Sequence, residues 1–375
     1  MTGIETNSTI TIDSTVLIDL KVNVMKIGLL TSGGDCQGLN AALRGVAKTL
    51  FNAVPYMELY GIQDGYRGLI EREWRRMELR EFSGILREGG TILGTSKQSN
   101  KNMPDTDEVN MDNLNAMVQN YQNERFEALV ILGGNISHET AFALSQNGVN
   151  VVTLPQTIDN DLFGTDYTFG FDSAVSKATE FIDAIHSTAA AHRRVFVIEL
   201  MGNKAGWVTL FAGMAGGADV ILLPEIPYSL SSVLGVIKKR NQIGKRASII
   251  AIAEGAVTKE EAAIPQKERK PEGRSSGSRL VRVLAQRLKQ DVRLLIPGHF
   301  QRGGEPTPTD RMLCTRMGVK AGELILERQY GRMISLSGTA ITSVPLDEVA
   351  GKTRTIPPDC EILTQARLIG ISLGE

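Results

Sequence analysis

Residues 126–161, FEALVILGGNISHETAFALSQNGVNVVTLPQTIDND, decide the fold of this chain. The apolar run Phe126–Leu132 is typical of a buried strand, and the turn Gly133–Gly134–Asn135 leads into Ser137–Gln146, whose pattern predicts a helix. A second apolar run, Val149–Leu154, predicts another strand. Two strands joined by a helix form a right-handed β-α-β crossover with parallel strands.

The turn after this unit carries two carboxylates, Asp159 and Asp161, two residues apart. Pro155 cannot donate a hydrogen bond to a strand ladder, so the chain leaves the sheet there and both side chains project from the strand's carboxyl end. In open α/β sheets, ligands bind at that edge. An Asx turn, in which a carboxylate bonds nearby backbone, is the structural alternative.

The same alternation extends along the chain in both directions. Upstream, Met25–Thr31 predicts a strand and Leu39–Phe51 a helix, with a glycine-rich turn between them. The downstream predictions are helices at 172–190, 206–214, 231–239, 278–290 and 310–328, strands at 194–200, 219–223, 247–253 and 293–296, and a β-rich tail at 333–344. This alternation predicts an α/β fold whose sheets are mostly parallel and flanked by helices.

Three segments interrupt this pattern. Residues 100–123 are polar and predict a loop that leads into a helix, and residues 259–278, rich in charge, Pro and Gly, predict an exposed excursion. Residues 1–24 form an N-terminal extension. For this extension a disordered segment, an edge strand and an upstream start all remain open.

Composition limits the classes of function. The 375 residues are 42% hydrophobic and 22% charged, which predicts a globular chain of two domains of about 150 residues each. A net charge of −1 gives no general reason to expect nucleic acid or an anionic membrane as partner. The odd cysteine count disfavours a disulfide framework or a zinc site, and without a long apolar run or a secretory signal we expect a cytoplasmic protein.

Two glycine-rich loops follow predicted strands. Ser32–Asp35 and Gly133–Ser137 each stand between a strand and a helix, where free backbone N–H groups and the helix dipole can hold phosphate oxygens. One such loop can serve tight turn geometry alone. Two of them on one sheet favour phosphate binding.

Phosphoryl transfer to a hydroxyl requires a base, cations and rigid alignment. Asp159 can accept the hydroxyl proton, and Asp161 can face a metal ion or orient the turn. Further polar clusters lie beside predicted strand ends: residues 191–194, 201–203 and 298–304, together with Glu254. Basic residues among glycines suit a phosphorylated, hydroxylated substrate. For His299, a structural and a functional role remain equally open.

The motifs TSGGDCQGLNAALRGV, GGTILGTSK, LVILGGN, PQTIDND and PGHFQRGG, with the run 191–202 and Glu254, resemble the 6-phosphofructokinases in order and spacing. The resemblance covers about residues 25–330. It implies two α/β lobes with the active site in the cleft between them. It also implies glycolytic transfer of a phosphoryl group from ATP or diphosphate, with Mg²⁺, to the 1-hydroxyl of fructose 6-phosphate.

The resemblance also implies roles for individual residues. The catalytic residues would be Asp159, Thr157 and Arg194, and the metal ligands Asn135 and Asp161. The phosphoryl donor would be held by Gly34, Lys97, Gln98, Gly134, Asn135, Ile136 and Ser137. The sugar phosphate would be held by Thr157, Ile158, Asp159, Arg194, Met201, Gly202, Asn203, Glu254, Arg293, His299, Phe300, Gln301 and Arg302.

The implied assembly has two levels. Residues 25–170 with 302–345 would form the donor lobe, and residues 171–301 with 346–375 the sugar-phosphate lobe. Arg194 and Arg293 match arginines that reach the substrate from a neighbouring subunit, so a homo-oligomer, a dimer or a tetramer, would complete each site. Allosteric control is also implied by the resemblance: Arg44 and Lys48 match two basic positions of the family's effector site, and the other positions of that site are not assigned in this chain.

Four positions depart from the family pattern. Asn135 replaces the usual Asp and offers the metal one negative charge fewer. Ile136 and Gln156 stand where Gly marks ATP users, or Asp and Lys mark diphosphate users, and we expect both to face the donor. Asn203 replaces an Arg of bacterial ATP users. Three hypotheses stay open: an ATP-dependent kinase, which we favour, a diphosphate-dependent enzyme, and a weakly catalytic sugar-phosphate-binding paralogue.

Overall fold

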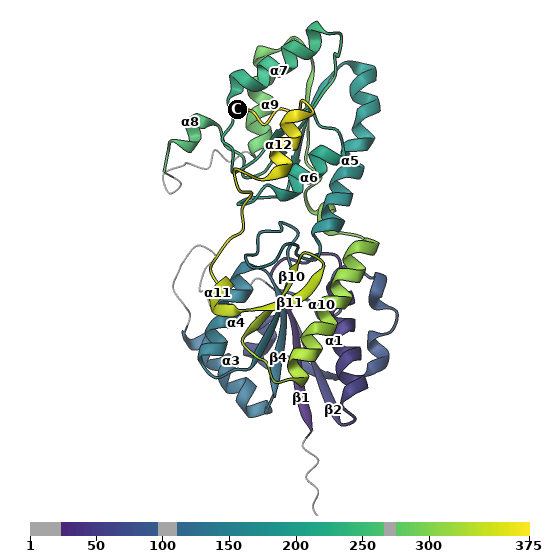
Figure 1. The fold of residues 1–375 in the computed structure, drawn as a ribbon, viewed down its shortest axis with the longest axis vertical. Coiled ribbons are helices and arrows are strands. Elements are labelled where there is room, and N and C mark those ends of the chain that lie inside the picture. The colour runs from purple at the N-terminus through teal and green to yellow at the C-terminus, as the bar shows by residue number, and fades with distance from the viewer. Residues whose placement is uncertain (1–23, 97–110, 266–274) are drawn as a thin grey trace, which may run out of the picture.

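The computed structural model describes residues 24–96, 111–265 and 275–375. Within these residues the strands form two sheets, one of seven strands in the order β11-β10-β5-β4-β1-β2-β3 and one of four in the order β7-β8-β6-β9. Figure 1 shows two lobes stacked along the long axis of the molecule, one around each sheet. We call them the larger and the smaller lobe.

The larger lobe is built from two distant parts of the chain. Its strands are β1 (Met25–Ser32), β2 (Met57–Ile62), β3 (Trp74–Met77), β4 (Ala128–Gly133), β5 (Val151–Pro155), β10 (Arg332–Ser337) and β11 (Ala340–Pro345). Its helices are α1 (Leu39–Ala53), α2 (Tyr66–Glu71), α3 (Met111–Glu124), α4 (Asn135–Gln146), α10 (Pro308–Leu326) and α11 (Leu346–Val349), with 3-10 turns η1 (Leu79–Phe82) and η2 (Ile85–Arg87).

The smaller lobe takes the middle of the chain and its end. Its strands are β6 (Val195–Leu200), β7 (Val220–Leu222), β8 (Ser248–Ala253) and β9 (Val292–Leu295). Its helices are α5 (Phe171–His192), α6 (Trp207–Ala215), α7 (Leu230–Gln242), α8 (Lys259–Ala262), α9 (Ser276–Arg287) and α12 (Glu361–Leu368), with the 3-10 turn η4 (Gly298–Arg302) after β9.

Parallel pairing dominates both sheets, because helical crossovers join most of the strands. β4 pairs in parallel with β1 and β5, and every residue of β4 and β5 is buried, as expected for central strands covered on both faces. Only β3 and β11, the two edge strands of the larger sheet, pair antiparallel within the described ranges. The predicted α/β class with mostly parallel sheets flanked by helices is confirmed.

The core of the larger lobe follows the predicted helix face. Leu39, Leu43 and Leu50 of α1 are fully buried against the sheet. On its other side α1 crosses α10, where a Cβ on Gly45 would lie 3.1 Å from the Cα of Gly318. The two glycines therefore let the helix backbones touch, which larger residues would prevent.

Some predicted boundaries and segments need correction. Most predicted elements occur within a few residues of their expected bounds, but the predicted excursion at 259–278 contains α8 and the start of α9. Sequence reasoning missed β2, α2 and β3, which fill the chain between α1 and residue 77, and also α12. The predictions for residues 1–23 and 97–110 lie outside the described residues.

Three connections join the lobes: the entry into α5, the chain from η4 to α10, and the segment between α11 and α12 (Figure 1). Leu346 and Val349 of α11 pack in the core of the larger lobe, beside β5 and α4. The exact domain boundaries stay a prediction. No helix among the residues that the structure describes is long and apolar enough to cross a membrane.

Candidate active site

The turn after β5 has a fixed backbone. The Asp159 N–H donates to Thr157 Oγ1 at 3.1 Å, and Thr168 N–H donates to Asn160 Oδ1 at 2.9 Å. Asn160 is left-handed, with φ 51°, a conformation that Asn tolerates better than most residues. Ile158 is fully buried and anchors the turn to the core rather than facing a ligand. These backbone contacts leave Oδ1 of the Asp159 carboxylate without a hydrogen-bond partner among the described residues.

Asp159 holds a charge that the fold does not neutralise. Its Oδ1 is buried, and no hydrogen-bond donor in the described part of the chain reaches it. Burial, together with the nearby Asp161 carboxylate, raises the pKa of Asp159 to about 7 against the opposing charge of the Arg302 guanidinium. A carboxylate with a pKa close to neutral pH is suited to general-base catalysis.

Asp161 lies against the start of α4. Asn135 Nδ2 donates to Asp161 Oδ2 at 2.9 Å, and burial raises the pKa of Asp161. Lys204, which sequence reasoning missed, opposes this shift by its positive charge. Little in the sequence indicates that Lys204 lies near Asp161, because an isolated Lys in a polar loop usually lies in solvent.

The residues around the turn supply oxygen donors that fit a magnesium ion. Asp159 and Asp161 are two desolvated carboxylates, and Asn135, whose Nδ2 is bound to Asp161, keeps an amide oxygen for a cation. No group of three or more His, Cys, Asp and Glu side chains that could hold a metal occurs in the described ranges. Mg²⁺ usually takes one or two carboxylates and completes its shell with water and phosphate, so this donor set is sufficient.

Arg302 joins the first glycine loop to the base. Its Nη1 donates to the Asp35 carbonyl at 2.9 Å, and a Cβ on Gly34 would lie 2.6 Å from the same nitrogen. The guanidinium also lowers the pKa of Asp159 and of Glu254 by its charge. Glycine at position 34 is therefore what lets a cation lie against this loop.

Gln156 corrects an expectation. Its side chain is only 2% exposed, and its Nε2 donates to the Gly34 carbonyl at 2.5 Å. Its backbone N–H donates to the Gly133 carbonyl at 3.0 Å. Gln156 therefore does not face a donor site; it ties the two glycine loops together.

The second glycine loop is built around Ser137. The buried Ser137 hydroxyl donates to Ser32 Oγ at 3.1 Å, and the backbone carbonyl of Ser137 accepts from Tyr66 Oη at 2.7 Å. A Cβ on Gly133 would lie 2.3 Å from Ser137 Cβ, so glycine is required there. The Ser137 side chain thus links the two loops, whereas Ile136, 45% exposed in the first turn of α4, is open to a ligand.

The carboxyl edge of the smaller sheet contributes the facing residues. Met201 and Gly202 follow β6, and the exposed Glu254 follows β8, with its N–H donating to the Leu200 carbonyl at 2.9 Å. Partial loss of water around its carboxylate raises the pKa of Glu254, and the charges of Arg302 and the exposed His299 oppose this shift. The structure thus brings Glu254, His299 and Arg302 into one electrostatic cluster with Asp159.

Several predicted residues at this edge have structural contacts. Gln301 is fully buried, and its Oε1 accepts from the Met201 N–H at 3.3 Å. Phe300 packs its ring on Phe181 of α5, with the ring centroids 6.3 Å apart. The exposed Asn203 approaches Gly255 closely, since a Cβ there would lie 1.8 Å from the Asn203 carbonyl oxygen.

Gln37 was missed by sequence reasoning. This fully buried residue donates from Nε2 to the carbonyls of Gln301 and Gly303, at 3.1 and 2.8 Å. It fastens the first glycine loop to the loop after β9, and so fixes Arg302 opposite Asp159. Its position inside a glycine-rich turn was the only signal in the sequence.

Arg194 and Arg293 do not join this cluster within one chain. Both lie at the amino-terminal edge of the smaller sheet, where each guanidinium pairs with Asp291 at 2.8 Å. β6 spans six residues, so that edge is about 20 Å from Met201. Their contribution from a neighbouring copy stays a prediction, and Lys97 and Gln98 lie outside the described residues.

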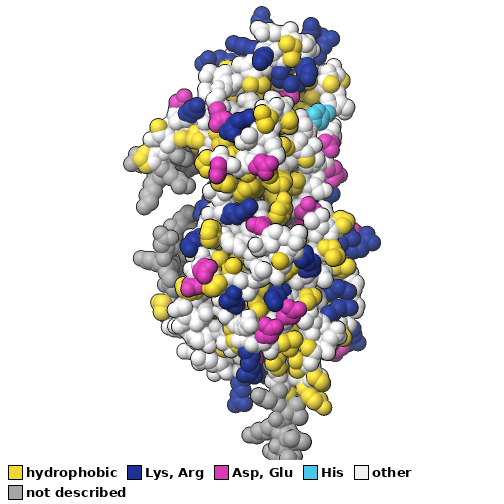
Figure 2. Space-filling view, viewed as in Figure 1, with side chains coloured by type: hydrophobic (Ala, Val, Ile, Leu, Met, Phe, Trp, Pro, Cys, Tyr) yellow, Lys and Arg dark blue, Asp and Glu magenta, His cyan; other side chains and the backbone are white. Residues whose placement is uncertain are grey.

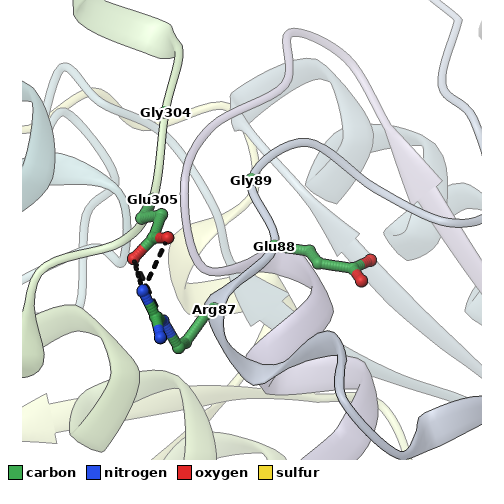
Figure 3. A pocket seen from close by; sticks show the side chains of 5 residues that line it. All are labelled: Arg87, Glu88, Gly89, Gly304 and Glu305. Carbon is green, nitrogen blue, oxygen red and sulfur yellow. Dashed lines mark hydrogen bonds and ion pairs between the residues drawn. The ribbon is translucent and has the colours of Figure 1, made fainter.

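A hollow between the end of η2 and the chain from η4 to α10 is lined by Arg87, Glu88, Gly89, Gly304 and Glu305 (Figure 3). Arg87 Nη2 pairs with Glu305 Oε1 at 2.9 Å, while the Glu88 side chain points away from this pair. The charges of Arg87 and Glu305 are therefore paired with each other. Two of its lining residues, Gly304 and Glu305, follow Arg302 closely in sequence, but no residue of the turn after β5 lines the hollow.

Comparison with known proteins gives a consistent result. A sequence model of the family described as Phosphofructokinase matches residues 26–325. The ATP-dependent 6-phosphofructokinase of Spirochaeta thermophila is 46% identical over 360 residues, covering 93% of this chain and 97% of that protein. ATP-dependent 6-phosphofructokinase 3 of Bacteroides thetaiotaomicron is 45% identical over 356 residues, covering 93% of this chain and all of that protein.

Solved structures agree. Phosphofructokinase of Pichia pastoris in the T-state superposes with a TM-score of 0.76 at 31% identity over 86% of this chain, which spans 35% of that longer chain. A pyrophosphate-dependent phosphofructokinase of Nitrosospira multiformis gives a TM-score of 0.77 over 94% of this chain and 92% of that one; at 18% identity it shows the fold alone. This chain belongs to the phosphofructokinase family.

Proposed function

We propose that this chain transfers the γ-phosphoryl group of ATP to the 1-hydroxyl of fructose 6-phosphate, giving fructose 1,6-bisphosphate and ADP in glycolysis. The observation that carries the proposal is Asp159: a buried carboxylate with an unpartnered oxygen and a pKa of about 7, at the carboxyl end of β5. The two relatives at 46% and 45% identity, both called ATP-dependent, support ATP as donor.

In the proposed reaction Asp159 takes the proton of the 1-hydroxyl as its oxygen attacks the γ-phosphorus. The bond from that phosphorus to the β-γ bridging oxygen breaks, and ADP leaves. Arg302, whose charge already acts on Asp159 and Glu254, would lie between the phosphates and the sugar. Mg²⁺, held by Asp161 and Asn135, would neutralise charge on the phosphates when bound.

The sugar phosphate would contact the carboxyl edge of the smaller sheet. Glu254 offers a carboxylate for sugar hydroxyls, and His299 a polar ring in the same cluster. Arg194 and Arg293 would reach the 6-phosphate of a neighbouring copy, which makes a homo-oligomer part of the proposal. The three free cysteines, all within the described ranges, fit the reducing cytoplasm in which we place the reaction.

A diphosphate-dependent reaction is the second candidate, because the exposed Ile136 side chain fills space at the start of α4. The test gives purified protein fructose 6-phosphate and Mg²⁺ with ATP or diphosphate in parallel, and measures fructose 1,6-bisphosphate. We expect turnover with ATP. Turnover with diphosphate alone would replace ATP as donor, and none with either at concentrations well above about 1 mM would contradict both enzyme functions.

A further inference from the structure

The segment between α11 and α12 crosses from the larger to the smaller lobe (Figure 1). We call residues 353–356 the crossing segment. It follows the region that matches the family, which ends at residue 325. Figure 2 shows hydrophobic side chains gathered on this face at the level where the lobes meet.

The crossing segment binds the catalytic turn through backbone and side chain. Thr353 forms an antiparallel bridge with Leu162, and the Arg354 N–H donates to the Asp161 carbonyl at 2.7 Å. Arg354 Nη1 donates to the Asn160 carbonyl at 3.1 Å. These two carbonyls belong to the peptides on either side of the Asp161 Cα. One residue therefore fixes both peptide planes that aim the Asp161 side chain.

Arg354 is itself held by the smaller lobe. Its guanidinium carbon lies 4.2 Å from the centre of the Trp207 ring, and Trp207 Nε1 donates to the Arg354 carbonyl at 3.4 Å. Trp207 is 5% exposed and begins α6. A guanidinium stacked on an indole face combines a cation–π contact with free N–H donors at its edge. Trp207 thus holds the fork of Arg354 toward the turn.

Glu225 holds the other end of the crossing segment. Its carboxylate accepts from the Ile356 N–H at 3.0 Å and from the Gly206 N–H at 3.0 and 3.2 Å. Gly206 begins the turn into α6, a few residues after Met201 and Gly202, which are proposed to bind the sugar phosphate. The Glu225 carboxylate therefore joins the crossing segment to the loop between β6 and α6.

We propose that Arg354 is a positioning residue for phosphoryl transfer: bound to Trp207 of the smaller lobe, it aims the Asp161 carboxylate of the larger lobe. The crossing segment makes the orientation of the turn depend on contact between the lobes. This inference rests on the proposed function for its kinetic consequences, but its structural consequence is independent of turnover.

The test compares Arg354→Met, which keeps the apolar stem without donors, with Arg354→Lys, which keeps the charge without the planar fork. Arg367→Met is the matched control, because Arg367 pairs with Glu375 on the exposed side of α12. All variants carry Trp74→Phe, which leaves Trp207 as the only tryptophan of the two in the chain. Thermal unfolding shows which variants are folded at the assay temperature.

In the metal-free protein, hydrogen exchange of peptides covering 157–168 should be several-fold faster in Arg354→Met than in Arg367→Met, while β8 peptides stay unchanged. The Trp207 emission should change in the same variant. With substrates, kcat should fall between about 10-fold and 100-fold, with the KM for fructose 6-phosphate within about twofold. Arg354→Lys should recover part of this loss.

A lower melting temperature with unchanged kcat and unchanged exchange in the turn would overturn the proposal, since Arg354 would then only stabilise the fold. If Arg354→Met does not fold, hydrogen exchange in the turn and kcat, measured on Arg354→Lys and on Trp207→Phe, decide the proposal in its place. Absence of turnover in the parent protein would contradict the proposed function, while the exchange and emission results would still decide the positioning role.

Discussion

At the scale of single residues, Asp159 links the chemistry to stability. Its pKa rises from an ordinary 3.8 to about 7 in the folded chain. Between these values the folded state binds more protons than the unfolded state, so this group's contribution to stability falls as pH rises from about 4 to about 7. Above that pH the folded chain carries a buried carboxylate without a donor.

Asp159→Asn should therefore raise the melting temperature of the metal-free protein at pH 8 by a few degrees and have little effect at pH 4. The amide removes the buried charge while keeping the shape of the side chain. Thermal unfolding in the presence of a chelator measures this. Asp183→Asn, on the exposed side of α5, is the control. A variant less stable than the parent at pH 8 would show that the charge is compensated.

At the scale of elements, the first glycine loop and the loop after β9 work as a pair. A Cβ on Gly34 would lie 2.6 Å from Arg302 Nη1, the mobile end of a long side chain. Gly34→Ala should push the guanidinium away without breaking the fold. We expect kcat/KM to fall by about tenfold or more, with a melting temperature close to that of the parent.

Gly235→Ala on α7 is the matched control, because a Cβ there meets nothing within 4 Å. In this variant kcat/KM should stay near the parent value, and the melting temperature should not fall, because Ala is the better helix former. Parent-like kcat/KM in Gly34→Ala would mean that the position of Arg302 beside this loop does not matter for the reaction.

Sequence reasoning predicted the elements with strong periodicity. The β4-α4-β5 unit was found because its strands are buried on both faces and its helix buries one face. The β2-α2-β3 region was missed. β3 is a short edge strand whose two middle residues, Arg75 and Arg76, are both exposed, so it lacks an apolar signal.

At the site, sequence reasoning located the residues at strand ends but not the directions of their side chains. The carboxylates of Asp159 and Asp161 were placed correctly because the chain leaves the sheet at Pro155, so that both side chains extend from the carboxyl end of β5. Gln156 was misassigned, since nothing in the sequence shows that the Gly34 carbonyl needs a donor. Arg354 lies about 190 residues from the turn in sequence, and no local pattern connects them.

At the scale of the whole molecule, the residues predicted to form the site are divided between the two edges of the smaller sheet. Asp159 faces its carboxyl edge, and Arg194 with Arg293 lies at the opposite edge. If these arginines act on a neighbouring copy, Asp159→Asn and Arg194→Ala affect different residues of a shared site. Each variant alone should be poorly active.

Mixing the two variants under conditions that exchange subunits should restore activity, because some shared sites then receive an intact Asp159 and an intact Arg194. The rate of fructose 1,6-bisphosphate formation measures this against each variant mixed with itself. No recovery in mixtures that demonstrably exchange would place Arg194 in the site of its own chain, or outside the reaction.

The central claim is that Asp159 is the base for transfer from ATP to fructose 6-phosphate. Steady-state kinetics of the parent and Asp159→Asn at pH 8, with Asp183→Asn as control, tests it most directly. We predict that kcat falls about 100-fold or more in Asp159→Asn alone, with little change in the KM for fructose 6-phosphate. An Asp159→Asn enzyme with kcat close to that of the parent would contradict the account.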